Sequence, residues 1–339
     1  MYGRNFPKLS RITNKEGFEP FYRTDTELWS YPRLLFGAIF LFPFRLICMI
    51  IVVSSYLFWV SVLTLGHDME QPLTNFRRKG FVIVNKIFPR IALMIAGYIR
   101  IKTNKLQDYD YSKWLGKDYK APEFYASSIS NHSAWTDMFV MLIRTGGVSF
   151  VAKESIRNVF LFGKVGIALN TIFVSRISST EDRENAVKMI QDRQTHIMEG
   201  KGKNVNLHIF PEGATTNNNY LIPFKRGVFT SLSPVLPIFV KYSSSYFNPA
   251  HDVIPMHYHF FVLLCQISNN LEVTELPIFE PNDFLFTNHG TKGQEKWKVY
   301  ADAVRDVMSE VSGLPTHEAS LKQKNECKKM LYGSGFKED

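Results

Sequence analysis

The sequence predicts an α/β fold with a mixed central sheet flanked by helices, preceded by an N-terminal helical segment embedded in a membrane. Three observations support this prediction. Short β-rich runs alternate with helical runs from residue 102 onward, which is typical of an α/β sheet. The hydrophobic share of 45% allows a buried core and excludes a disordered chain. One long apolar stretch near the N-terminus contains no charged residue.

The first part of the chain is predicted to be a polar arm, residues 1–33, followed by a membrane segment, residues 34–66. Residues 46–66 carry no charge, and at about 1.5 Å per residue such a helix matches the hydrocarbon thickness of a bilayer. Pro43 and Arg45 interrupt the apolar run, which favours two helices joined by a bend over one straight helix. The segment therefore either crosses the bilayer or forms a hairpin in one leaflet, with a buried core helix as the third alternative.

Residues 67–101 are predicted to form a linker and an interfacial helix. The linker carries three consecutive basic residues, Arg77, Arg78 and Lys79. Basic side chains beside an apolar segment suit a layer of lipid headgroups. Residues 81–99 are mostly apolar, and their charges Lys86 and Arg90 are four positions apart, on one face of a helix. We therefore expect this helix to lie in the interface with both charges facing water.

The globular part is predicted to cover residues 102–315, followed by a polar tail, residues 316–339. Six short runs have β character: residues 124–129, 149–152, 171–175, 206–210, 235–241 and 271–276. Helices are predicted most clearly over residues 180–199 and 293–312. Because no repeat or long linker interrupts this pattern, we expect one domain on a membrane anchor.

The charge balance favours anionic partners. The chain has 40 Lys+Arg against 31 Asp+Glu, a formal net charge of +9, which suits nucleic acid, an anionic membrane surface or a phosphorylated substrate. Nucleic acid is not expected as a partner, because the basic residues form no long cluster and no nucleic-acid-binding module is present. The three cysteines match no metal or redox spacing, which indicates structural thiols in a reducing compartment.

Polar residues gather where a β-rich run gives way to an apolar helical run. In the segment SNHSAWTD, residues 130–137, His132 and Asp137 are five positions apart, and a turn there would bring both side chains together. A histidine can take a proton from a hydroxyl near neutral pH, and a carboxylate can orient its ring. The alternative is a packed histidine beside an acid that begins a helix.

Three further segments follow in order: NTIFVSR at residues 170–176, IFPEGATTN at residues 209–217 and SPVLPIFVKY at residues 233–242. Together the four segments resemble the motifs of the glycerolipid acyltransferase family. Its first motif, Asn-His-x-x-x-x-Asp, is matched by Asn131, His132 and Asp137. The resemblance covers roughly residues 38–315 and is closer to the lysophosphatidylcholine acyltransferase branch.

This resemblance implies an O-acyltransferase that moves a fatty acyl group from acyl-CoA to the free hydroxyl of a lysophospholipid such as lysophosphatidylcholine. His132 would be the catalytic base and Asp137 its partner. The residues expected to bind substrate are Asn131, Arg176, Glu212, Gly213, Thr215, Lys225 and Lys153. Ala214 stands where relatives usually have threonine. Acyl-CoA would be a co-substrate, and we expect no other cofactor and no metal.

The expected mechanism is direct attack in a ternary complex, because the chain has no suitably placed cysteine and no Gly-x-Ser-x-Gly segment to form an acyl-enzyme. Two alternatives stay open. The acceptor could be lysophosphatidic acid or glycerol-3-phosphate, or the chain could be a structural or lipid-holding subunit that binds other subunits of a membrane complex. The expected location is the endoplasmic reticulum membrane. A basic N-terminus keeps a mitochondrial membrane as the alternative.

Overall fold

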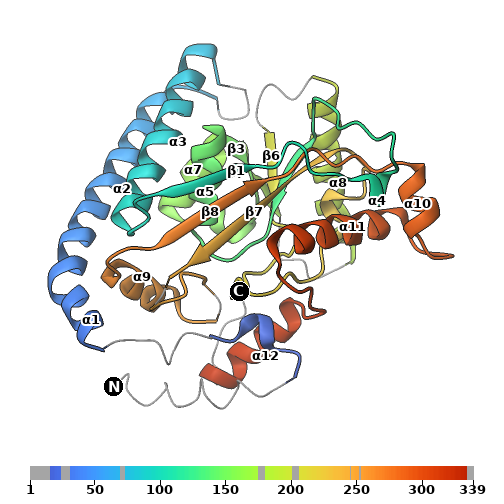
Figure 1. Cartoon of the computed structure of the whole chain (residues 1–339). Coiled ribbons are helices and arrows are strands. Elements are labelled where there is room, and N and C mark those ends of the chain that lie inside the picture. The colour runs from blue at the N-terminus through green and yellow to red at the C-terminus, as the bar shows by residue number, and fades with distance from the viewer. Residues whose placement is uncertain are drawn as a thin grey trace.

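The computed structural model describes most of the chain: residues 16–23, 31–68, 73–174, 180–200, 206–244, 246–251 and 253–333. Its centre is a six-stranded sheet with helices on both faces (Figure 1). The strands run in the order β1-β8-β7-β2-β6-β3, and neighbours are parallel except for the antiparallel pair of β7 and β8. The predicted α/β class with a mixed central sheet is therefore confirmed.

The strands of this sheet are β1 (Ile101–Lys105), β2 (Ser127–Ser130), β3 (Val148–Ser149), β6 (Asn206–Ile209), β7 (Val235–Ser243) and β8 (Asn270–Glu275). A separate parallel pair consists of β4 (Val151–Lys153) and β5 (Ile172–Val174). β2 is central and fully buried although it is rich in serine. Ser128 and Ser130 bond the two ring nitrogens of His208, at 2.9 and 3.2 Å, so their hydroxyls are satisfied inside the sheet.

Most of the helices pack on one of the two faces of the sheet. They are α1 (Tyr31–Phe36), α2 (Phe42–Thr64), α3 (Asn75–Ile95), α4 (Ser112–Leu115), α5 (Asp137–Thr145), α6 (Glu154–Arg157), α7 (Phe160–Ala168), α8 (Thr180–Met198), α9 (Met256–Cys265), α10 (Asp283–His289), α11 (Lys296–Ser312) and α12 (Leu321–Tyr332). One core includes residues of α2, α3, α5, α7 and α9, and the other includes residues of α4, α8, α10 and α11. Val240 and Phe239, successive residues of β7, enter opposite cores, as the alternation of a strand requires.

The apolar N-terminal segment is one long helix. α1, the π-helical turn η4 (Gly37–Leu41) and α2 follow one another without a break, and Figure 1 shows them along one side of the molecule. Within the described residues, Tyr31–Thr64 is the one helix long and apolar enough to cross a membrane. Pro43 does not interrupt it. The wide turn η4 lies directly before this proline, and a π turn can absorb the local distortion that proline imposes.

α2 is attached to the globular part near both of its ends. Arg45 donates hydrogen bonds to the backbone carbonyls of Leu264 and Ile267, both at 3.0 Å, at the end of α9. Near the other end, Lys164 of α7 donates to Ser61 Oγ at 2.6 Å. The outward side of α2 is apolar and exposed. We call α1, η4, α2 and α3 the helical layer.

α3 packs between α2 and α5 and carries the two charges expected to face water. Lys86 is exposed. Arg90 instead reaches past the end of its own helix, where it donates to the carbonyls of Tyr98 at 3.0 Å and Ile99 at 2.7 Å. This contact fixes the chain where the helical layer passes into β1.

Segments from both ends of the chain meet in a third, smaller core. The 3-10 turn η2 (Glu19–Phe21) contributes Phe21, and α12 contributes Cys327 and Leu331, which pack around Ile222. Residues 321–332, within the expected polar tail, therefore form a helix with a buried apolar side.

Candidate active site

The site lies where the parallel strands β2, β6 and β7 end at the same edge of the sheet. Parallel strands place the segments that follow them side by side, which is why ligand sites of α/β sheets lie at this edge. Asn131 and His132 follow β2, Glu212 follows β6, and Tyr242 lies near the end of β7. Segments more than 100 residues apart in the chain therefore contribute to one site.

His132 and Asp137 are in direct contact. The Nδ1 atom of His132 lies 2.8 Å from Oδ2 of Asp137. The same oxygen accepts the backbone N–H groups of Ser133, at 2.7 Å, and Ala134, at 2.9 Å. Asp137 is the first residue of α5, where the helix dipole favours a negative charge. The carboxylate therefore closes the turn between β2 and α5 and also orients the imidazole.

The two side chains differ in exposure. Asp137 is fully buried, whereas 22% of the His132 side chain is exposed. The imidazole stacks on the ring of Phe210, with ring centroids 4.1 Å apart and planes at 18°. Because Nδ1 faces Asp137, the other nitrogen, Nε2, is the one that can meet a substrate. This geometry matches that of a histidine held as a general base.

Tyr242 completes the contacts of Asp137. Its hydroxyl donates a short hydrogen bond to Oδ1, the carboxylate oxygen that does not face His132. Thr136 Oγ1 lies 2.9 Å from the same hydroxyl. Burial, followed by the negative charge of Asp137, holds the pKa of Tyr242 well above its ordinary value.

Asn131, expected to bind substrate, ties the first motif to β7 instead of pointing to an open surface. Its amide nitrogen donates to the carbonyl of Val240 and its amide oxygen accepts the N–H of Val240, both at 2.8 Å. Its side chain thus makes the pair of backbone hydrogen bonds that a neighbouring strand would make, and it holds the segment before His132 in place.

Glu212 is almost completely buried and supports the backbone of the site. Its carboxylate accepts the N–H of His132 at 2.6 Å and the N–H of Ile222 at 3.1 Å. Burial raises the pKa of Glu212 to about 8, although these two N–H donors favour the charged form. The contacts of Glu212 thus support a positioning role, through the main chain of His132.

Gly213 and Lys225 meet directly beside this glutamate. Gly213 has a φ of +61°, a conformation that favours glycine, and a Cβ atom there would clash with the end of the Lys225 side chain. A larger residue at this position would therefore displace the lysine from its place across the third motif. Desolvation of the ammonium group, and then the charges of Lys153 and Arg183, hold the pKa of Lys225 below its ordinary value. These three cations form a positive cluster. Lys153 and Arg183 are exposed, whereas the ammonium group of Lys225 is partly desolvated.

Two other predicted residues have different surroundings. Thr215 is held by α12, because Nζ of Lys324 donates to the Thr215 carbonyl at 2.9 Å and also bonds its hydroxyl. Arg176 lies outside the described residues.

The structure adds residues that the sequence pattern does not single out. Tyr242 ends the fourth motif segment but has no spacing that links it to Asp137. Phe210, beside the third motif, supplies the ring on which His132 stacks. His208 lies close by but is fully buried, and burial lowers its pKa to about 3, so it is neutral and structural.

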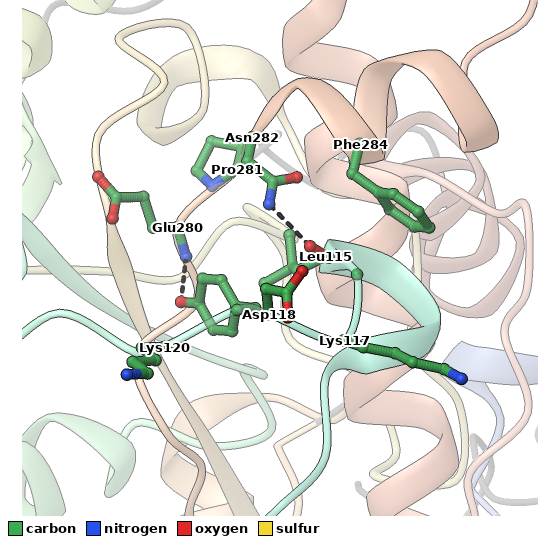
Figure 2. A pocket seen from close by; sticks show the side chains of 10 residues that line it. Leu115, Lys117, Asp118, Lys120, Glu280, Pro281, Asn282 and Phe284 are labelled. Carbon is green, nitrogen blue, oxygen red and sulfur yellow. Dashed lines mark hydrogen bonds between the residues drawn. The ribbon is translucent and has the colours of Figure 1, made fainter.

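Neither a metal site nor the surface pocket coincides with these residues. Within the described part of the chain, no group of three or more His, Cys, Asp or Glu side chains could hold a metal ion. Figure 2 shows a pocket of about 650 Å³ between two loops, where Asn282 donates to the Leu115 carbonyl at 2.8 Å. Its lining includes none of the predicted site residues.

Comparison with known proteins finds acyltransferases. A family model described as Acyltransferase matches residues 119–241, which contain the first three motif segments and all of the fourth except its last residue. The lysophospholipid acyltransferase LPEAT1 of Arabidopsis thaliana is 32% identical over 60% of this chain and 48% of its own length. The lysophosphatidylcholine acyltransferase of Drosophila melanogaster is 26% identical over 84% of this chain and 50% of its own. Human lysophosphatidylcholine acyltransferase 2 is 24% identical over 87% and 49%.

The chain thus spans about half the length of the curated relatives it matches. Among solved structures, the 1-acyl-sn-glycerophosphate acyltransferase PlsC from Thermotoga maritima is 16% identical, covers 83% of this chain and 97% of its own, and has a TM-score of 0.47. The fold assignment rests on the strand order given above and not on this likeness. Through its motifs, the matched domain and the named relatives, the chain is similar to acyltransferases that include lysophospholipid and lysophosphatidylcholine acyltransferases.

Proposed function

We propose that the protein is an acyl-CoA-dependent O-acyltransferase that acylates the free hydroxyl of a lysophospholipid, of the lysophosphatidylcholine type. The observation that carries this proposal is the contact of 2.8 Å between His132 Nδ1 and Asp137 Oδ2, beside a partly exposed ring edge. The names of the relatives support the choice of a lysophospholipid acceptor.

The proposed chemistry needs one base and no acyl-enzyme. The acceptor oxygen attacks the thioester carbonyl carbon while its proton moves to Nε2 of His132. The tetrahedral adduct then collapses, the carbon–sulfur bond breaks, and the CoA thiolate leaves. The imidazolium returns its proton to that thiolate. Asp137 stabilises the charged imidazole between the two steps.

The positive cluster supports binding of a phosphorylated substrate. Lys153 and Arg183 both act electrostatically on Lys225. Lys225 lies against Gly213, next to the glutamate that holds the backbone of His132. Cations grouped in this way attract the phosphates of CoA or of a lipid headgroup. We also propose Arg176 as a phosphate contact. This role rests only on its position in the second motif.

The helical layer supports work at a membrane. Large apolar side chains of α2 and α3 face outward, while Arg77, Arg78 and Lys79 begin α3. This combination suits a lipid surface with anionic headgroups. We place the enzyme in a membrane, with the endoplasmic reticulum as the proposed organelle, and fractionation of cells that express the tagged protein tests that choice.

Purified protein and a panel of acceptors test the function. The protein is incubated with one labelled acyl-CoA and, separately, with lysophosphatidylcholine, lysophosphatidylethanolamine, lysophosphatidic acid or glycerol-3-phosphate. We expect a labelled diacyl product with lysophosphatidylcholine. Product with only lysophosphatidic acid or only glycerol-3-phosphate would assign the alternative acceptor. No product with any acceptor would contradict the enzyme and favour the subunit alternative.

Varying both substrates tests the mechanism. Direct attack requires a ternary complex, so double-reciprocal plots should intersect. Parallel lines together with an acylated protein, detected by intact-mass measurement, would overturn direct attack.

A further inference from the structure

The two carboxylate oxygens of Asp137 have separate tasks. Oδ2 accepts three N–H groups, those of the His132 ring and of the Ser133 and Ala134 backbone. Oδ1 accepts the hydroxyl of Tyr242, which comes from β7, 105 residues further along the chain. Asp137 is fully buried and Tyr242 is 4% exposed, so water cannot replace this donor.

The hydroxyl of Tyr242 is itself oriented. A tyrosine hydroxyl has one proton to donate, and here that proton goes to the carboxylate. The contact of 2.9 Å with Thr136 Oγ1 must therefore be one in which the threonine donates and the tyrosine oxygen accepts. Thr136 is fully buried and directly precedes Asp137. A chain of oriented donors thus runs from Thr136 through Tyr242 to Asp137, whose other oxygen accepts the ring N–H of His132.

We propose that Tyr242 is a positioning residue for acyl transfer: its hydroxyl holds Oδ1 of Asp137, so that Oδ2 stays directed at Nδ1 of His132. This inference rests on the proposed function. Without the tyrosine hydroxyl, Oδ1 loses its donor and the carboxylate is held only by the three N–H groups on Oδ2. The carboxylate can then tilt about Oδ2, which loosens the orientation of the imidazole that general-base catalysis needs.

Tyr98 offers a matched control. It is fully buried, its ring packs against that of Tyr242 at 5.8 Å and 64°, and its hydroxyl lies near Thr136 and Asp137 without a hydrogen bond to the carboxylate among the described residues. Tyr98→Phe and Tyr242→Phe therefore remove the same atom from neighbouring buried rings. Only the second change removes a hydrogen bond to Asp137.

The kinetic experiment compares wild type, Tyr242→Phe, Tyr98→Phe and Thr136→Val. We expect Tyr242→Phe to lower kcat about 10-fold with KM for both substrates within about twofold, in the range for losing a hydrogen bond to a charged group. Tyr98→Phe should stay within about twofold of wild type. Thr136→Val, one contact further away, should lower kcat about threefold, and it decides the question if Tyr242→Phe does not fold.

A spectroscopic readout separates this inference from the proposed function. With ¹⁵N-labelled histidine, the proton on His132 Nδ1 should give a downfield resonance, assigned by its loss in His132→Ala. Tyr242→Phe should shift or broaden that resonance, and Tyr98→Phe should leave it in place. An inactive wild type would overturn the acyltransferase proposal but still allow this comparison. Equal spectra and equal kcat in the two phenylalanine variants would overturn the role of Tyr242.

Discussion

The edge of the sheet and the helical layer differ in which side chains they bury. At the edge, polar residues are buried and bonded: Asn131, Asp137 and Glu212 are exposed by only 2%, 0% and 1%. In the helical layer, large apolar residues face outward, with Phe44 exposed by 69% and Ile47 by 59%. Each region departs from the usual distribution of polar and apolar residues, and each departure indicates a task.

The sheet edge and the helical layer depend on different interactions. Buried polar groups must find partners inside the protein, so the edge is pre-organised and its geometry can be disturbed by one atom. Exposed apolar groups need cover from outside, so the helical layer depends on total apolar area and not on any one contact. Single substitutions should therefore abolish chemistry at the edge, whereas only multiple charges should detach the helical layer.

The largest effect is expected from Asp137→Asn. The change removes the negative charge that stabilises the imidazolium and places an amide among three N–H donors, so kcat should fall at least ~10²-fold. Asp283→Asn is the matched control, because Asp283 also begins a helix but is exposed. Turnover of Asp137→Asn within a few-fold of wild type would remove the carboxylate from the mechanism.

A smaller effect is expected when two charges are placed on the helical layer. The double variant Ile47→Glu and Ile51→Glu puts carboxylates on the outward side of α2, and its binding to phospholipid vesicles should weaken ~10-fold or more. Activity on detergent-dispersed substrate should be retained. The control carries Met189→Glu and Met198→Glu on α8, two exposed apolar positions away from the helical layer. Equal vesicle binding of both double variants in a flotation assay would contradict a role of α2 in membrane binding.

A moderate effect of pH on stability is expected from Glu212. Its pKa is raised from about 4.5 to about 8 in the folded protein, so the folded state holds a proton that the unfolded state releases. The stabilisation is fully present below about pH 4.5 and is lost as pH rises to about 8. The unfolding midpoint of wild type should therefore fall more steeply over this interval than that of Glu212→Gln. Glu123→Gln, at an exposed position, should keep the wild-type slope, and parallel curves for all three proteins would contradict the raised pKa.

The smallest effect is expected at the contact between α12 and the third motif. Lys324→Met removes the hydrogen bonds to Thr215 and a positive charge near Glu212, and should lower the free energy of unfolding by about 1–2 kcal/mol. Lys322→Met changes an exposed lysine of the same helix and should have little effect. Chemical denaturation of both variants measures the difference. Equal stabilities would show that α12 does not support the third motif through Lys324.

Much of the sheet could be predicted because buried strands have apolar or β-branched runs in the sequence. Residues 206–210 and 235–241 correspond closely to β6 and β7. β1, with the sequence IKTNK, is different: it is polar, largely exposed and pairs only with β8, so no apolar pattern marks it. The order of the strands also depends on long-range pairing, which local sequence does not encode.

In the candidate site, too, some contacts follow from local sequence and others depend on long-range pairing. The meeting of His132 and Asp137 follows from local spacing, because both belong to one turn between β2 and α5. The partner of Oδ1 could not be predicted, since Tyr242 reaches Asp137 only through the pairing of β2 with β7. The same holds for Glu212, whose target is the backbone N–H of His132 and not a side chain with a spacing rule.

In the proposed mechanism, His132 is the base that removes the proton of the acceptor hydroxyl. The most direct test measures kcat of His132→Ala and of wild type in the same vesicles, at saturating acyl-CoA and lysophospholipid, with acyl-CoA affinity measured in parallel. We expect a fall in kcat of at least ~10²-fold and little change in that affinity. Near-normal turnover of His132→Ala would contradict it, because another group would then have to remove the proton.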